Sequence, residues 1–252
     1  MGQSSGRRWF LKSVTALGGA ASLPAPAPAA EPHAQHGTRV PSQTYMYLTQ
    51  PEVAFVEAAV ARLIPADELG PGAKEAGVAT FIDRQLFGGW GTMAKMYRQG
   101  PWPEGTPQQG YQSPLTPQQV YRIGIGEVNA HCTKQYGSSF SALTAAQQDE
   151  VLRGLDGGKI GLEGVRSQFF FNMLLANTLE GFFADPIYGG NRDKVGWKLV
   201  GFPGVAAVYT AHVDQHGVPY NAMPVSIQDI VDKVAQVDEH GHPKHVLLTR
   251  KD

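Results

Sequence analysis

The sequence GLEGVRSQFFFNMLLANTLEGFFA, residues 161–184, is the strongest candidate for the core of this protein. Asn172, Asn177 and Glu180 interrupt its apolar residues, so the unbroken apolar part is too short for a membrane span of ~20 residues. The pattern predicts a central helix that is buried on most sides. Its large apolar residues are Phe169, Phe170, Phe171, Met173, Leu174, Leu175, Leu179, Phe182 and Phe183.

Helical patterns continue on the N-terminal side of this stretch. The capping box at residues 49–52 begins an apolar stripe that Pro65 ends. Further helices are expected over 78–87, over 92–98, from Thr116-Pro117 to Tyr136, and from the capping box at Thr144 to about Gly157. No useful length shows the period-two alternation of a strand. The sequence therefore predicts a mostly α fold, with one helical domain over residues 45–252.

Two regions outside these helices are expected to be irregular. Residues 99–116 are rich in proline and glycine and also carry Trp102 and Tyr111, so we expect a long loop that packs on something within or outside the chain. The tail, 205–252, has one short helix expected over 227–237 and lacks the apolar density for a core of its own. We expect it to extend over a surface, either its own or a partner's.

The N-terminus has the three parts of a twin-arginine export signal. A basic run is followed by a short, mild apolar stretch at 13–23 and by Ala27-Pro28-Ala29, which favours cleavage near residue 30. Residues 1–30 are thus interpreted as a cleavable signal and 31–44 as a flexible linker. The alternatives are an uncleaved membrane anchor and a disordered basic N-terminus that carries no export signal. The residues of the motif are Arg7, Arg8, Phe10, Leu11 and Lys12.

Charge and cysteine content narrow the functional classes. The formal net charge is −1, and loss of residues 1–30 would remove three basic and no acidic residues. A mildly acidic chain argues against nucleic acid as a partner. Cys132 is the only cysteine, so an internal disulfide is impossible. In an exported protein it is either a buried inert thiol or one half of a disulfide between subunits.

Motifs for cofactors and catalysis are missing from the sequence. It has no dinucleotide-binding glycine run after a strand pattern, no phosphate loop, no haem-attachment motif and no nucleophile elbow. His212 and His216, and the group at 240, 242 and 245, lack the further ligands that a designed metal site needs. His131 beside Cys132 would point elsewhere on a helix, so the pair does not predict a catalytic dyad. We therefore expect no catalytic, cofactor or metal site in this chain.

The segment that follows the apolar stretch, 185–204, is the most distinctive in polar chemistry. Asp185-Pro186 should end the central helix, and Gly189-Gly190 should permit a positive φ. Asn191, Arg192 and Asp193 then offer polar groups. Two interpretations stand side by side: a tight turn that satisfies its own polar groups, or a partner interface rich in hot-spot residues. The interface residues would be Asp185, Tyr188, Gly189, Gly190, Asn191, Arg192 and Trp197.

The run Gly181-Phe-Phe-Ala-Asp-Pro-Ile-Tyr-Gly-Gly-Asn-Arg-Asp193, continued by Gly196-Trp-Lys198 and Gly201-Phe-Pro-Gly204, resembles the signature of the gluconate 2-dehydrogenase subunit 3 family. The resemblance extends to the twin-arginine leader and to residues 55–65. It implies the small gamma subunit of bacterial flavin-dependent dehydrogenases that oxidise sugars, sugar acids or polyols.

Several expectations follow from this resemblance alone. A large subunit would hold FAD, with or without an iron–sulfur cluster. Many complexes add a multihaem cytochrome c subunit. The small subunit would bind and help mature the flavoprotein and would carry it through the Tat translocase to the periplasm, free or held at the membrane by the complex. The alternatives left open are a stand-alone periplasmic oxidoreductase or hydrolase with an unrecognised site, and a chaperone that meets its client transiently.

Overall fold

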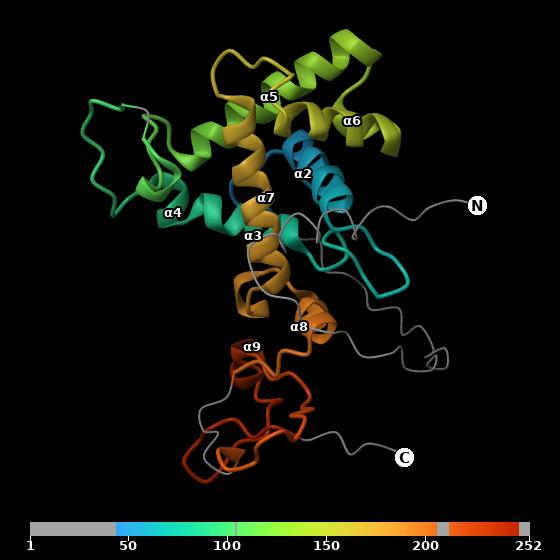
Figure 1. The fold of residues 1–252 in the computed structure, drawn as a ribbon, viewed down its shortest axis with the longest axis vertical. Helices are drawn as coiled ribbons and strands as arrows, with labels where there is room; N and C mark the ends of the chain where they lie inside the picture. The colour runs from blue at the N-terminus through green and yellow to red at the C-terminus, as the bar shows by residue number, and fades with distance from the viewer. Residues whose placement is uncertain (1–43, 104, 206–211, 247–252) are drawn as a thin grey trace.

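The computed structural model describes residues 44–103, 105–205 and 212–246. Its N-terminal part, up to residue 200, is a bundle of helices around one central helix (Figure 1). The chain contains α2 (Gln50–Leu63), α3 (Val78–Phe87), α4 (Gly89–Thr92), α5 (Pro117–Tyr136), α6 (Ala145–Asp156), α7 (Ser167–Phe183), α8 (Val195–Val200) and α9 (Ile227–Val231). Within these described ranges there is no β-strand, only isolated bridges. The prediction of a mostly α fold is confirmed.

Local sequence signals account for most helix ends. Thr49 and Thr144 form the predicted capping boxes at the start of α2 and α6, and Thr116 forms a further one at the predicted start of α5. Proline is the second residue of α2 and the first residue of α5, where its missing N–H costs nothing. The left-handed Gly137 ends α5.

The apolar stretch becomes α7, which contacts α2, α3, α5, α6 and α8 and runs through the middle of the bundle (Figure 1). Phe170 is fully buried, with its ring centroid 6.2 Å from that of Phe55 and 5.9 Å from that of Tyr121. Gly124 allows this close packing of α5 on α7, because a Cβ there would lie 2.5 Å from the Phe170 ring. Gly124 thus serves helix packing.

The polar residues that interrupt the apolar run of α7 are either hydrogen-bonded or exposed. The Tyr121 hydroxyl donates to Asn177 Oδ1 at 2.8 Å, and Asn177 Nδ2 donates to Glu180 Oε2 at 3.0 Å. Asn177 and Tyr121 are both buried, so their mutual hydrogen bond offsets the cost of removing them from water. Asn172 is exposed. These placements explain how an interrupted apolar run still forms a central helix.

Three helix boundaries differ from the predictions. The helix expected over 92–98 is instead the short α4, since Met93 adopts a left-handed φ of 54° and ends it. The central helix begins at Ser167 rather than near 161. The helix in the tail ends at Val231, and Lys233 turns the chain with φ 58°.

The Pro-rich region 99–116 is a long loop, as predicted, with a 3₁₀ turn at Pro107–Gln109. Tyr111 ties it to the bundle: its ring lies 5.4 Å from Phe169, and its hydroxyl donates to Leu115 O at 2.6 Å. Burial raises the pKa of Tyr111 to about 12. In its described part the tail does not spread over the helical body (Figure 1). Its described part extends beyond α8 at one end of the molecule (Figure 1).

The signal residues Arg7, Arg8, Phe10, Leu11 and Lys12 lie outside the described residues. Within the described ranges, no helix combines the length and the hydropathy that a membrane crossing requires.

Candidate functional site

The segment 185–204 folds back against the C-terminal end of α7 through two 3₁₀ turns, Pro186–Tyr188 and Arg192–Lys194, followed by α8. Asn191 is fully buried and joins these elements: its Nδ2 donates to Ala184 O at 2.8 Å, and its Oδ1 accepts from Gly196 N at 2.8 Å. The Trp197 indole N–H donates to Phe183 O at 2.7 Å. These bonds satisfy carbonyl groups that the end of a helix leaves free.

Asp185 connects this segment to the C-terminal tail. Its carboxylate accepts from Ile187 N at 3.0 Å within its own turn. It also accepts from Ile227 N at 2.7 Å and Gln228 N at 3.4 Å, the first residues of α9. The side chain is buried, so a negative charge at the start of α9 is held by N–H groups that need an acceptor.

The two neighbouring glycines are required for different reasons. Gly189 has φ 103°, as the sequence predicts for this pair. Gly190 does not use a positive φ. Its backbone crosses α7 so closely that a Cβ would lie 2.1 Å from Gly181 O. The reason for glycine at 190 is therefore the close approach of two backbones.

Arg192 and Tyr188 occupy the outer side of the segment. The Arg192 backbone N–H donates to Ala76 O at 3.0 Å, which holds the segment against the start of α3, and its side chain is half-buried. Tyr188 is 51% exposed. Of the predicted interface residues, Asp185, Gly190, Asn191 and Trp197 are buried within the chain, while Tyr188 is open to a partner. Direct binding of a partner by this segment stays a prediction.

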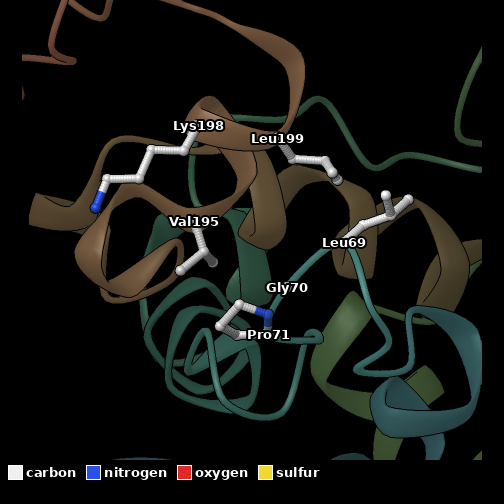
Figure 2. A pocket seen from close by; sticks show the side chains of 6 residues that line it. All are labelled: Leu69, Gly70, Pro71, Val195, Lys198 and Leu199. Carbon is white, nitrogen blue, oxygen red and sulfur yellow. The ribbon is translucent and has the colours of Figure 1, made fainter. Parts of the chain in front are cut away.

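An apolar pocket of about 210 Å³ lies beside the segment (Figure 2). Leu69, Gly70 and Pro71 of the loop after α2 form one side, and Val195 and Leu199 of α8 form the other. Lys198 also lines it, but Figure 2 shows its ammonium group extending away from Leu69. The lining carries no carboxylate, imidazole or thiol, so its chemistry suits an apolar contact and offers no acid, base or nucleophile.

A second hollow, of about 280 Å³, lies within the tail and holds three of the histidines. His245 is held at both ring nitrogens, with Nδ1 2.7 Å from the Tyr220 hydroxyl and Nε2 2.9 Å from Val205 O. His242 Nδ1 lies 3.2 Å from Asp238 Oδ2. In the part of the chain that the structure describes, no group of three or more histidine, cysteine, aspartate or glutamate side chains is placed to hold a metal ion.

A third hollow, of about 750 Å³, lies between the Pro-rich loop and the start of α7. Trp102, Leu115 and Phe169 line it, together with Arg166 and a series of small loop residues. It is an open surface that mixes apolar and polar groups. The two aromatic residues of this loop therefore have different surroundings: Tyr111 packs within the chain, and Trp102 borders this hollow.

Cys132 lies on the apolar side of α5 and is fully buried. Burial raises the pKa of its thiol to about 11, which keeps it protonated and unreactive near neutral pH. A disulfide with a partner would require this part of α5 to open.

With the geometry in place, the comparisons identify the family. The family model described as gluconate 2-dehydrogenase subunit 3 matches residues 50–204. The chain belongs to the gluconate 2-dehydrogenase subunit 3 family. Membership implies a chain that works in complex with other dehydrogenase subunits. No curated protein and no solved structure gave a match.

The family match begins at α2 and ends at Gly204, which closes the segment built around Asn191. Gly204 has φ 83°, and a Cβ there would lie 2.0 Å from Val225 O. The sequence pointed to this segment correctly as the distinctive one. It left open whether the polar side chains face inward or toward a partner, because the partners of Asp185 lie about forty positions away.

Proposed function

We propose that this chain is the non-catalytic small subunit of a periplasmic FAD-dependent dehydrogenase that oxidises a sugar, a sugar acid or a polyol. The observation that carries the proposal is the joint presence, on one chain, of the family body at 50–204 and the Arg7-Arg8 leader. The chain would bind the large flavoprotein subunit, help it mature and carry it through the twin-arginine translocase, which accepts folded cargo.

The architecture is compatible with a role as scaffold. Dinucleotide cofactors such as FAD are commonly held by a strand, a glycine-rich turn and a helix, and the described residues contain no strand. In the proposal FAD therefore belongs to the large subunit, with or without an iron–sulfur cluster. Haem c would belong to a multihaem cytochrome c subunit that accepts the electrons.

Three surfaces outside the tail present apolar side chains to a partner, in one case together with polar groups. They are the pocket of Figure 2, the hollow bordered by Trp102, and exposed Tyr188 at the end of the signature segment. Buried Asp185, Asn191 and Trp197 would act on such an interface indirectly, by fixing the backbone that presents it.

Export of the complex gives the decisive test. Replacement of Arg7-Arg8 by Lys-Lys, with the flavoprotein co-expressed, should leave dye-linked sugar dehydrogenase activity in the cytoplasm. The control is the same Arg→Lys exchange at Arg153, an exposed residue of α6. Periplasmic activity that persists without the twin arginines would contradict the escort role.

Activity of the isolated chain separates the proposal from a stand-alone oxidoreductase or hydrolase. The purified mature chain should show no flavin absorbance and no substrate oxidation until the large subunit is added. Turnover by the chain alone would favour the stand-alone enzyme.

The state of Cys132 is tested on the assembled complex. Non-reducing gels of the complex should show separate subunits if the thiol stays buried. A band at the summed mass that disappears on reduction would establish the inter-subunit disulfide instead.

A further inference from the structure

Two arginine side chains from different elements meet at the turn around Gly189. Arg84 of α3 reaches this turn: its Nη1 donates to Ile187 O at 3.3 Å and would lie 3.1 Å from a Cβ at Gly189. Arg192 reaches it as well, because its Nη2 and Gly189 O lie 3.1 and 3.3 Å from the Cβ position of Gly77. Both guanidinium groups are therefore close to the same short stretch of backbone.

Neither arginine has a carboxylate partner among the described residues. In these ranges no aspartate or glutamate oxygen lies within 4.0 Å of a nitrogen of Arg84 or Arg192. Arg62 shows the contrast, since its Nε lies 2.7 Å from Asp149 Oδ1. Two neighbouring positive charges without a counter-ion repel each other, and an anion placed between them would be stabilised by both.

The acidic residues on the neighbouring elements do not supply the counter-ion. Asp83 is buried and accepts three backbone N–H groups of the segment before α2. Asp185 holds the start of α9, and Glu75 accepts a backbone N–H of its own loop. Asp193 follows Arg192 in the chain, but it is exposed and forms no ion pair with it. The first turn of α3 contains no acidic residue.

The site faces outward and is already positioned. Arg84 is exposed, Arg192 is half-buried, and the neighbouring Tyr188 is 51% exposed. The Arg192 backbone N–H donates to Ala76 O at 3.0 Å, which fixes where its side chain begins. Arginine forks bind carboxylates through paired hydrogen bonds, and arginine and tyrosine are common at the centres of interfaces.

We propose that Arg84, Arg192 and Tyr188 form the contact site for a carboxylate-bearing segment of the flavoprotein subunit. An aspartate or glutamate side chain of that segment would accept hydrogen bonds from both guanidinium groups, and Tyr188 would pack beside it. The inference rests on the proposed function and adds the place and the chemistry of one contact. It requires an acidic surface on the partner where this chain is locally basic.

The test measures the affinity of the full mature chain for the FAD-binding subunit of the same complex. The double variant Arg84→Gln, Arg192→Gln should weaken binding by about tenfold or more, because it removes both charges from the contact. The matched control, Arg153→Gln with Lys159→Gln, removes two exposed positive charges elsewhere and should bind like the wild type. Circular dichroism melting verifies that each variant is folded.

Salt dependence separates a charge contact from a structural role of the two arginines. Wild-type affinity should fall as salt is added, because ions at about 0.1 M screen exposed charges beyond about 10 Å. The Arg84→Gln, Arg192→Gln variant should depend less on salt. Weak binding by this variant with the salt dependence of the wild type would show that the arginines only support the turn, and the proposal would be wrong.

A second double variant keeps the charges and removes the forks. Arg84→Lys with Arg192→Lys should bind more tightly than the glutamine pair and more weakly than the wild type, because an ammonium group cannot form the paired hydrogen bonds. Lysine variants that bind no better than the glutamine pair would contradict a contact based on charge. This pair also retains the test if the glutamine pair does not fold.

The outcomes separate the two proposals. If the wild type fails to bind the flavoprotein subunit, the proposed function is wrong and this inference falls with it. If the wild type and the glutamine pair bind equally well, the function stands and the contact site is wrong. Light scattering should show a monomer for the isolated chain. A dimer that the glutamine pair dissociates would mean that a second copy supplies the carboxylate, which would overturn the assignment to the flavoprotein.

Discussion

Phe55, Phe170 and Tyr121 of the helical body are at most 1% exposed, whereas across 212–246 only Val225 and Ser226 are buried. The body is stabilised by apolar burial around α7. The C-terminal segment, residues 212–246, depends on backbone hydrogen bonds and on its attachment to Asp185 and Lys194. One chain thus contains a region that is stable through its own core and a region whose apolar side chains remain available.

The family match covers the body and stops where the C-terminal segment begins. What this chain shares with its family is therefore the scaffold. The role of the C-terminal segment cannot be taken from that match.

The largest difference between the regions should appear when an apolar side chain is truncated. Phe170→Ala should lower the free energy of unfolding by about 3–5 kcal/mol, because it leaves a cavity between Phe55 and Tyr121. Val231→Ala should change it by less than about 0.5 kcal/mol. Chemical denaturation measures both, and similar losses would show that α9 is packed far more tightly than the structure has it.

A smaller loss is expected at the connection between α7 and α8. Asn191→Ala removes the partners of Ala184 O and Gly196 N and should cost about 1–3 kcal/mol. Asn172→Ala, at an exposed site of α7, is the matched control and should be near neutral. If the two variants melt alike, the role assigned to Asn191 is incorrect.

A local effect is expected at the attachment of the C-terminal segment. Asp185→Ala removes the acceptor of the Ile227 and Gln228 N–H groups, so their protection from hydrogen exchange should fall by about tenfold or more. Amides of α7 should keep their protection. Asp193→Asn, at an exposed site nearby whose φ of 56° suits aspartate and asparagine, should change neither region. Equal loss throughout the chain would show that the two regions unfold as one.

The smallest effect concerns pH. Burial alone would raise the pKa of Asp229, but the Lys194 ammonium and the Ser226 hydrogen bonds outweigh it and hold that pKa below its ordinary 3.8. A carboxyl group with a lowered folded pKa stabilises the fold above its unfolded pKa. This contribution is therefore present at neutral pH and is lost as pH falls below about 4 through the folded pKa.

Carbon NMR titration of the Asp229 carboxyl group measures this directly. Lys194→Met should raise the pKa of Asp229. The contribution of Asp229 to the attachment of α9 should then no longer be lost as pH falls. Lys198→Met, on the exposed side of α8, is the control and should leave the titration unchanged. An unmoved Asp229 pKa in Lys194→Met would exclude the ion pair as its cause.

Sequence patterns predicted the helices where a local signal marks each end. The capping boxes at Thr49, Thr116 and Thr144 are such signals, because cap and partner lie three residues apart. The prediction was wrong over 92–98. The short α4 forms just before that range and contains glycines, which usually end a helix. Gly91 allows the backbone to lie close to Leu86 O.

The sequence predicted where the candidate site lies better than it predicted what its residues do. The polar composition of 185–204 suggested both a self-satisfied turn and an interface. The buried bonds of Asn191 and Trp197 show that much of this chemistry is used within the chain. Arg84 gave no signal of its place beside this segment, because it lies 103 residues from Ile187, whose carbonyl group it contacts.

The helical class, the central helix and the family signature could be read from the sequence alone, because each depends on residues close together along the chain. The tertiary structure decided which polar groups face inward and which apolar groups stay outside. The Asp185 carboxylate accepts a hydrogen bond from the N–H of Ile227, 42 residues further along the chain. Such pairings depend on how the elements pack, and no local pattern in the chain records them.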